Sequence, residues 1–293
     1  MIAFNFNIHF KDESSLDDGI SDTTKTDLFI TLSQDTKLFE QLSHRSEYLE
    51  MSGRMAAYGA EQVYSECREG CQWGVDVQGV LSILWYSGAQ SITYIPQEGY
   101  SPELLQFWVL HTILPMKLAL ENTYDILHVG AVEVAGAPII FSAESFGGKS
   151  TMTDFFIQQG HALLSDDTLG VYREDDTFMA VASYPFHRPY REAESLGYKV
   201  THVTTEPKPI KAFFLLEKGT PDATVSIREV KGIKKYRAFH FSTFVNFDFL
   251  KEARFKRLSA MAQSIPVYEV TVPWNLERLP EVYKAITKHV CSL

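Results

Sequence analysis

Hydrophobic residues occupy every second position at the start of the chain, which is the pattern of a half-buried strand. One strand is therefore predicted from Ile2 to Phe10. A second strand is predicted at residues 27–32, and a hairpin that turns at Gly88 is predicted at residues 81–95. In the glycine-containing stretch between these elements we expect short strands with turns at Gly70, Gly74 and Gly79.

A helix is predicted to follow these strands. Ser101 can cap its first turn, Pro102 suits the first helical position, and Glu103 suits the positive end of the helix dipole. Hydrophobic residues then recur at helical spacing until Pro115, which should kink or end the helix. Residues 1–122 are thus predicted to form a β-rich section that ends in a helix.

The next stretch has the order strand, loop, helix, strand. Residues 129–134 and 138–142 predict two strands joined by a tight turn. The octapeptide that follows, Ala-Glu-Ser-Phe-Gly-Gly-Lys-Ser (143–150), is close to the phosphate-binding pattern G-x-x-x-x-G-K-[ST]. A run with helical spacing follows and ends near Gly160. A third apolar run comes next, and Asp166 and Asp167 stand in the turn after it.

This order matches the chemistry of phosphate binding. Glycines let backbone N–H groups surround phosphate oxygens, and the helix N-terminus adds partial positive charge. Lys149 can reach the β- and γ-phosphates, while the Ser150 hydroxyl and the Asp166 carboxylate can hold Mg²⁺. The residues predicted to bind the nucleotide are Ser145, Gly147, Gly148, Lys149, Ser150 and Thr151.

These residues resemble the HPr serine kinase/phosphorylase family, and most closely its shorter HPr-kinase-related members. The resemblance is carried by His128, the loop 145–150, Gly160-His161 and Leu-Ser-Asp-Asp at 164–167. It continues through residues 265–268 and 274–279, which are similar to the closing strand and helix of the family, and covers about 170 residues. The implied fold is α/β with a mixed sheet, the P-loop core of the phosphoenolpyruvate-carboxykinase type, in residues 123–293.

The resemblance implies a kinase that uses ATP and Mg²⁺ and phosphorylates a hydroxyl group. Asp166 or Asp167 would accept the hydroxyl proton, and His128 would support that carboxylate. Two positions depart from the family pattern: Ala143 replaces the first glycine of the loop, and Phe146 replaces a small residue. Phe146 could crowd the triphosphate or pack on the adenine or the substrate.

The remainder of the chain is predicted to support this core. The proline-containing loop 184–191 carries Arg188 and Arg191, which could stabilise a phosphate or hold an acidic substrate, or simply lie at the surface. His161 is predicted to be structural, with a contact to the end of the preceding helix. The other predicted elements are a hairpin at 168–182, strands at 211–216 and 265–270, and helices at 252–263 and from about 275.

Composition limits the class of protein. The chain has 293 residues, 45% hydrophobic residues and a net charge of −10, which argue for an ordinary globular protein without a nucleic-acid or membrane partner. Cys67, Cys71 and Cys291 form no disulfide framework, so we expect reduced cysteines and a cytoplasmic protein. The partners expected are a nucleotide and a hydroxyl acceptor on a protein, a peptide or a metabolite. Assembly as a homo-oligomer is compatible with the sequence.

Three functions are consistent with the motif. The first is the kinase described above. The second is a regulatory protein that binds a nucleotide with little or no turnover, which the changes at Ala143 and Phe146 favour. The third is a decarboxylating kinase similar to phosphoenolpyruvate carboxykinase, although that family is longer and has further Lys and His motifs that we do not find. ATP consumption separates the first two, and dependence on oxaloacetate identifies the third.

Overall fold

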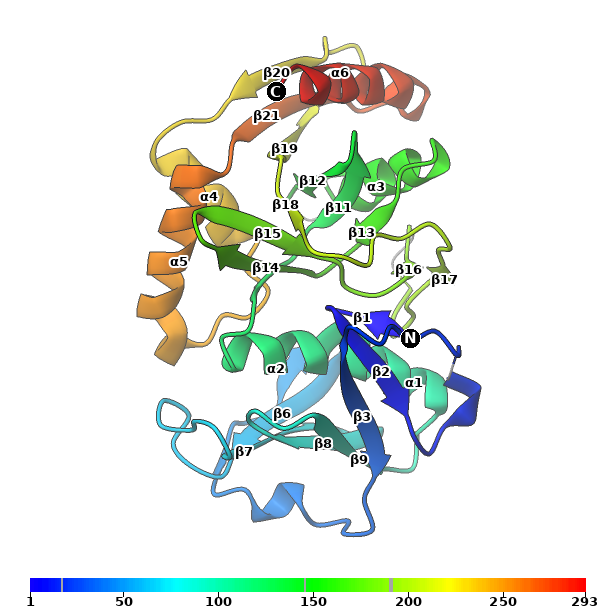
Figure 1. The fold of residues 1–293 in the computed structure, drawn as a ribbon, viewed down its shortest axis with the longest axis vertical. Helices are drawn as coiled ribbons and strands as arrows, with labels where there is room; N and C mark the ends of the chain where they lie inside the picture. The colour runs from blue at the N-terminus through cyan, green and yellow to red at the C-terminus, as the bar shows by residue number, and fades with distance from the viewer. Residues whose placement is uncertain (17, 145, 190–191) are drawn as a thin grey trace. The chain divides into compact units, whose positions relative to one another are not determined.

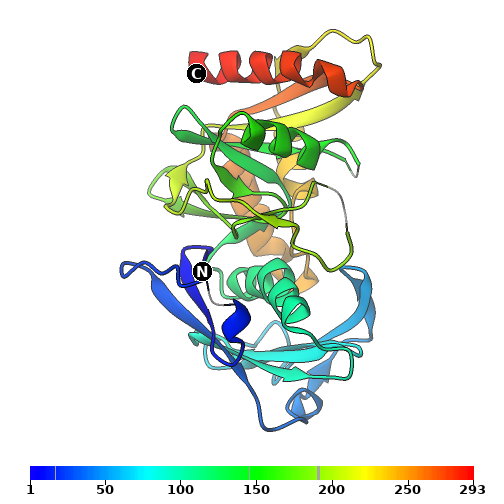
Figure 2. The same ribbon diagram turned by 90° about the vertical axis from the view of Figure 1, so that its right-hand side faces the viewer.

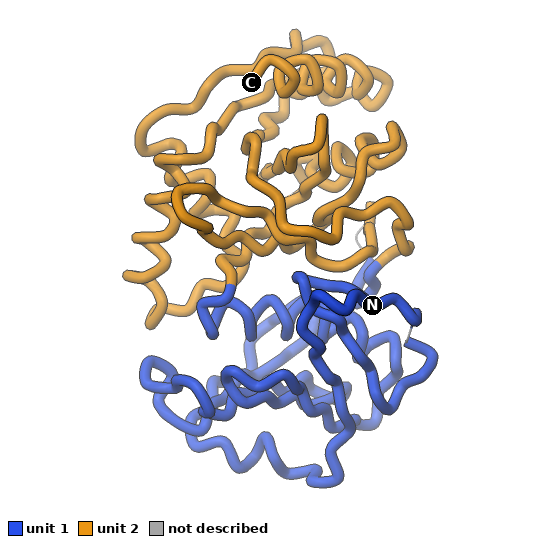
Figure 3. Tube along the Cα trace, viewed as in Figure 1, with its two compact units in different colours: residues 1–123, 191–196 blue, residues 124–190, 197–293 orange. Residues whose placement is uncertain are grey.

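The computed structural model describes residues 1–293 except 17, 145, 190 and 191, and it has a mixed α/β structure. Ser145 of the predicted nucleotide site and Arg191 of the basic loop lie outside the described residues. The chain forms two compact units (Figure 3). The first contains residues 1–123 and 191–196, and the second contains residues 124–190 and 197–293. The sequence did not indicate that 191–196 would join the first unit.

The first unit contains one mixed sheet with the strand order β1-β2-β3-β9-β8-β7-β6-β4, and β5 pairs with β6. The strands β2, β3 and β9 are parallel, and the others are antiparallel to their neighbours. The bounds are β1 (Ile2–Ala3), β2 (Phe6–Phe10), β3 (Thr26–Leu32), β4 (His44–Arg45), β5 (Leu49–Met51), β6 (Arg54–Ala60), β7 (Gln72–Val77), β8 (Leu81–Tyr86) and β9 (Ser91–Pro96).

Two strand predictions for this unit were wrong. The predicted strand Ile2–Phe10 is two strands, because Phe4 and Asn5 have φ values of 49° and 64° and reverse the chain between β1 and β2. The alternation of hydrophobic residues does not reveal this turn, because Phe4 keeps the pattern and is itself buried. Gly74 lies inside β7 rather than in a turn, where a Cβ atom would be only 2.9 Å from Leu42 Cδ1. The hairpin of β8 and β9 around Gly88 is confirmed.

The predicted helix is present in three parts: α1 (Pro102–Phe107), a π-helical segment (Trp108–Ile113) and α2 (Leu114–Leu120). The Ser101 hydroxyl accepts a hydrogen bond from the Leu104 N–H at 3.3 Å, as a cap should. Pro115 neither ends nor breaks the helix but lies in the first turn of α2. Since proline has no N–H to donate, the wider turn before it accommodates the missing hydrogen bond.

The expectation that all cysteines are reduced was wrong for one pair. Cys67 and Cys71 form a disulfide with a Cα–Cα distance of 5.4 Å, and Cys291 is an exposed free thiol. Both bonded residues are buried in the first unit. Three cysteines did not indicate a disulfide framework in the sequence, but the turn at Gly70 brings the side chains of this pair together.

The second unit contains a six-stranded mixed sheet with the order β13-β11-β12-β19-β21-β20 and a four-stranded antiparallel sheet with the order β10-β14-β15-β18. In the larger sheet β12, β19 and β21 are parallel. A small ribbon of β16 and β17 completes the unit. The bounds are β10 (Asp125–Leu127), β11 (Gly130–Val134), β12 (Ala137–Ser142), β13 (Leu163–Ser165), β14 (Leu169–Glu174), β15 (Thr177–Val181), β16 (Phe186–His187), β17 (Tyr198–Lys199), β18 (Lys208–Pro209), β19 (Ala212–Gly219), β20 (Ser226–Glu229) and β21 (Val267–Pro273).

Alternating side chains give the six-stranded sheet two hydrophobic faces. Val132, Phe141 and Phe214 face a core that includes helices α3 (Lys149–Gln158) and α6 (Leu279–Ser292). Their neighbours in the chain face a second core, formed with the four-stranded sheet and helices α4 (Ile233–Phe241) and α5 (Lys251–Ser264). The three-layer arrangement is visible in Figures 1 and 2, where α3 and α6 lie on one side of the sheet and α5 on the other.

Most predicted elements of the second unit are confirmed, including the hairpins β11–β12 and β14–β15, the strand β19 and the helix α5. Helix α4 was not predicted, because its Lys-rich start looked like a solvated surface stretch. In the part of the chain that the structure describes, no helix is both long and apolar enough to cross a membrane.

Candidate phosphate-binding site

The candidate site begins at the loop between β12 and α3. Phe146 and Gly148 have positive φ values of 61° and 87°, so the backbone turns twice before the helix starts. Gly147 lies between them and donates its N–H to Glu144 O at 2.8 Å. A Cβ atom at Gly147 would be 2.8 Å from Ala143 Cβ, so glycine is required there. Alternating conformations of this kind turn successive N–H groups toward one side and form concave anion sites.

Helix α3 starts at Lys149 and lies unusually close to β11. A Cβ atom at Gly130 would lie 2.1 Å from Thr153 Oγ1, and that hydroxyl donates to Lys149 O at 3.1 Å. The close approach places the first turn of α3 beside the ends of β11 and β13. Gly130 therefore has a packing role that the motif alone did not indicate.

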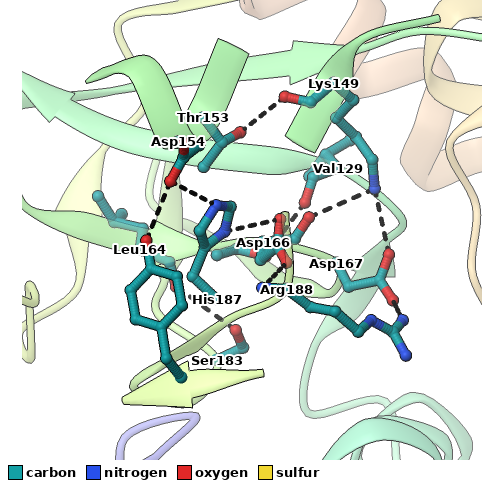
Figure 4. A network of polar contacts seen from close by, with 12 residues as sticks. Val129, Lys149, Thr153, Asp154, Leu164, Asp166, Asp167, Ser183, His187 and Arg188 are labelled. Carbon is teal, nitrogen blue, oxygen red and sulfur yellow. Dashed lines mark hydrogen bonds and ion pairs between the residues drawn. The ribbon is translucent and has the colours of Figure 1, made fainter. Parts of the chain in front are cut away.

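The Lys149 ammonium is the centre of a polar network (Figure 4). Its Nζ lies 3.2 Å from His128 Nε2, 3.2 Å from Asp167 Oδ1 and 3.4 Å from the backbone oxygen of Asp166. Because an ammonium can only donate, His128 Nε2 accepts, and the ring proton is on Nδ1. That nitrogen faces Asp167 Oδ1 at 3.1 Å. The structure thus brings three predicted residues together, with Asp167 rather than Asp166 as the carboxylate beside His128.

Backbone hydrogen bonds hold His128 and the aspartates at this position. The His128 N–H donates to Ser242 O at 2.5 Å, and the Val129 N–H donates to Asp167 O at 3.2 Å. On the neighbouring strand the Ser165 hydroxyl donates to Val129 O at 3.1 Å. The end of β13 is therefore fixed against the start of β11, which explains why residues 128 and 167 meet.

The two adjacent aspartates have different environments. The Asp167 carboxylate faces Lys149 with Oδ1 and the Arg188 guanidinium with Oδ2, at 3.2 and 3.1 Å. Asp166 is buried, with 4% of its surface exposed, and its Oδ2 accepts the Arg188 N–H at 2.7 Å. Arg188 therefore contacts both aspartates, one through its backbone and one through its side chain.

His187 is a residue that the sequence analysis missed. Its ring is fully buried, and its two nitrogens face carboxylates on both sides, Asp166 Oδ1 at 3.1 Å and Asp154 Oδ1 at 3.3 Å. Both distances allow ion pairing, but the atoms are not aligned as hydrogen bonds, so His187 Nδ1 and Nε2 and Asp166 Oδ1 lack a well-formed one. Only the basic character of the loop 184–191 could have drawn attention to this residue.

The site can be compared with the ligand preference of Mg²⁺. Among the described residues no group of three or more His, Cys, Asp or Glu is placed to hold a metal by itself. Mg²⁺ at nucleotide sites usually takes only one or two carboxylates, with waters and phosphate oxygens. Asp166 Oδ1 is a buried carboxylate oxygen without an aligned donor, and the partly buried Ser150 lies in the first turn of α3. This donor set fits Mg²⁺, with Ser150 and Asp166 as the residues that would hold it.

The negative charge of the aspartates also acts on Tyr184. Burial raises the pKa of the Tyr184 phenol well above its usual value of 10, and the charges of Asp167 and Asp166 raise it further. Tyr184 is therefore a neutral phenol at all ordinary pH values, and it supplies no base to the site.

The other predicted residues are placed as follows. Thr151 lies in the first turn of α3 and is partly buried. The Phe146 ring is 82% exposed and does not fill the loop. A methyl group on Gly148 would be 3.5 Å from the Trp274 ring, and Lys218 Nζ lies 4.0 Å from that ring's centre. His161 is structural, and its predicted contact with the end of α3 is confirmed, since its N–H donates to Phe156 O at 3.1 Å. Its ring nitrogens face Glu133 O at 2.9 Å and the Tyr283 hydroxyl at 3.0 Å.

Comparison with known proteins gives little to add. No protein-family model matches the chain, and no curated protein matches its sequence. Among solved structures, the HPr(Ser) kinase/phosphatase from Coxiella burnetii is similar over 57% of this chain and 97% of its own, with 11% sequence identity and a TM-score of 0.35. A similarity at this level shows neither the family nor the function of this chain.

Proposed function

We propose that this chain is a kinase that uses ATP and Mg²⁺ to phosphorylate a hydroxyl group on a protein, a peptide or a small molecule. The observation that carries the proposal is the position of Lys149. Its ammonium lies at the N-terminus of α3, directly after a loop of phosphate-binding sequence, and within 3.2 Å of both His128 and Asp167.

Each residue has a role in this proposal. Lys149 and the N–H groups of the loop and of Ser150 and Thr151 bind the β- and γ-phosphates. Arg188 lies beside the same carboxylate as Lys149 and balances charge on the transferred group. Ser150 and Asp166 hold Mg²⁺, which neutralises phosphate charge when it is bound.

Asp167 is the proposed proton acceptor for the attacking hydroxyl. It is the aspartate that faces the lysine, and His128 Nδ1 supports its Oδ1 from the other side. In this proposal Lys149 turns toward the phosphates when they bind, and the hydroxyl of the acceptor takes its place beside Asp167 Oδ1, while His128 and Arg188 keep the carboxylate in position. A carboxylate in this position acts by orienting the hydroxyl and taking its proton as the bond forms.

A second candidate is a regulatory protein that binds a nucleotide without turnover. It is favoured by the state of Asp167, whose two oxygens face a histidine, an ammonium and a guanidinium. If these partners stay in place after the nucleotide binds, the carboxylate cannot take a proton. Steady consumption of ATP in the presence of acceptor would exclude this candidate.

Nucleotide binding tests the proposal first. The affinity for ATP with Mg²⁺ is measured by calorimetry for the wild type, for Lys149→Ala and for Lys256→Ala, which removes an exposed lysine on α5 that pairs with Glu252. Lys149→Ala should weaken binding at least tenfold, since a hydrogen bond to a charged group contributes about 1.5–3 kcal/mol. Lys256→Ala should bind like the wild type. Equal affinity of all three proteins would refute the role of Lys149.

A further inference from the structure

The buried ring of His187 connects the two elements that carry the proposed metal ligands. Asp166 follows β13, and Asp154 lies on α3, one turn after Ser150. His187 lies between these carboxylates, with Nδ1 3.1 Å from Asp166 Oδ1 and Nε2 3.3 Å from Asp154 Oδ1 (Figure 4). A displacement of either element would change one of these two distances.

A partly buried structural histidine in the same unit, His161, has different partners. His161 faces a backbone carbonyl and a tyrosine hydroxyl, both within 3.0 Å, and neither partner carries charge. His187 has a carboxylate on each side, although it is fully buried. Burial of carboxylates costs free energy unless they are paired, so this arrangement is difficult to explain by packing alone.

Further contacts hold His187 in this position. The ribbon of β16 and β17 places Tyr198 against it with ring centres 5.5 Å apart, and the Tyr198 hydroxyl donates to Asp154 Oδ1 at 3.0 Å. Partial burial and this hydrogen bond raise the pKa of Tyr198 to about 12, so the phenol stays a donor. At Gly197 a Cβ atom would lie 2.1 Å from His187 O, so the backbone just before β17 lies directly against the backbone of His187.

We propose that His187 is a positioning residue that fixes the Asp166 carboxylate relative to Ser150 for a triphosphate that carries Mg²⁺. The inference rests on the proposed function. His187 bridges α3 and the end of β13, and the cation would be held by one residue from each. The Arg188 N–H supports the same role, since it holds the other oxygen of Asp166 at 2.7 Å. The neighbouring residues 187 and 188 thus leave Asp166 little freedom to rotate.

The test compares nucleotide affinity with and without Mg²⁺. ATP binding is measured by calorimetry for the wild type, for His187→Gln and for the matched control His161→Gln, with melting temperatures recorded alongside. His187→Gln should weaken binding of ATP with Mg²⁺ by roughly 10–100-fold, as expected when a partner of a metal ligand is lost. Binding of ATP without the metal should change by no more than about twofold, because Lys149 and the loop are intact. His161→Gln should alter neither affinity.

Combined variants separate positioning from general damage. Adding His187→Gln to Asp166→Asn should cause no further loss of affinity, because the carboxylate that it positions is already gone. If His187→Gln does not fold, Asp154→Asn replaces it: this residue is partly exposed, and the variant should give the same selective loss in smaller amount. An equal loss with and without Mg²⁺, or no loss, would overturn the inference alone. A wild type that binds no nucleotide would overturn the proposed function and this inference with it.

Discussion

Asp166 and Asp167 are adjacent in the chain, yet the turn after β13 directs their side chains to different neighbours. Asp167 meets Lys149, His128 and the Arg188 side chain, whereas Asp166 is buried against His187. Two carboxylates at one strand end would repel each other without such partners. The separation gives each one a distinct proposed role, proton acceptor for Asp167 and metal ligand for Asp166.

Another carboxylate of this unit, Glu133, makes stability depend on pH. Burial raises the pKa of Glu133, but hydrogen bonds from Lys208 at 2.6 Å and Thr204 at 2.8 Å lower it more, so the pKa lies below the ordinary 4.5. Because the folded state holds the ionised form, Glu133 contributes stability above pH 4.5. That contribution is lost as the pH falls through the lowered pKa.

The variant Glu133→Gln removes the charge and keeps the size of the side chain. Measured by urea unfolding, this variant should be less stable than the wild type at pH 7, and the difference should shrink as the pH falls below about 4.5. Glu174→Gln, at an exposed position beside the β14–β15 turn, is the control. A difference that stays constant from pH 7 to about pH 3 would contradict the stated cause.

At the scale of single residues, the sequence predicted those that belong to one short motif. Lys149, His128 and Asp167 could be found because the phosphate loop and its flanking strands fix where they meet. His187 was missed, and Arg188 was named only with a surface position as the alternative, because their contacts with the aspartates depend on a loop that returns to the site about 20 residues later. No local pattern specifies that return.

Among the elements, the contact between β11 and α3 is the one on which the site most depends. Gly130 allows the helix to lie so close that Thr153 is fully buried against the strand. The same contact places Lys149 at the ends of the strands, where it meets His128. Helix α3 can take this position only because Gly130 of β11 has no side chain.

Gly130→Ala should therefore destabilise the protein by about 1–3 kcal/mol, the usual cost of overpacking. The new methyl group would clash with Thr153 Oγ1, whereas the next atoms, Thr153 Cβ and Lys149 Cγ, are 3.4 Å away. Gly130→Ala combined with Thr153→Ala should regain most of the lost stability, measured by chemical unfolding, with Thr153→Ala alone as the control. A double variant no more stable than Gly130→Ala would show that the clash is not the cause.

Elements with a clear period and clear end signals were predictable, and exceptions have identifiable reasons. Ser101 marked a helix start correctly, but Pro115 did not end the helix because a π-helical segment accommodates it. The turn at Phe4 and Asn5 was hidden because hydrophobic alternation runs across it. Helix α4 was hidden because its exposed cations mask the two buried positions, Ala238 and Phe239, that pack it on the sheet.

In the whole molecule, the net negative charge is distributed unevenly along the chain. Residues 1–123 contain 7 of the 27 Lys and Arg and 17 of the 37 Asp and Glu, so the net charge of −10 belongs to this part of the chain. Residues 124–293 contain 20 of each kind and are neutral. The second unit, which leaves out residues 191–196, contains 19 Lys and Arg and 18 Asp and Glu, so it presents no net repulsion to a polyanion such as ATP.

The central claim is that the second unit transfers phosphate, with Asp167 as proton acceptor. The most direct measurement is transfer of labelled γ-phosphate from ATP to an acceptor or to water by the wild type, by Asp167→Asn and by Asp175→Asn, with melting temperatures checked. Asp175 has a φ of 50°, which asparagine tolerates, and lies at an exposed hairpin turn. Asp167→Asn should reduce transfer by about 10²–10⁴-fold and Asp175→Asn should not. Unchanged transfer by a folded Asp167→Asn protein, or no transfer by the wild type, would contradict the claim.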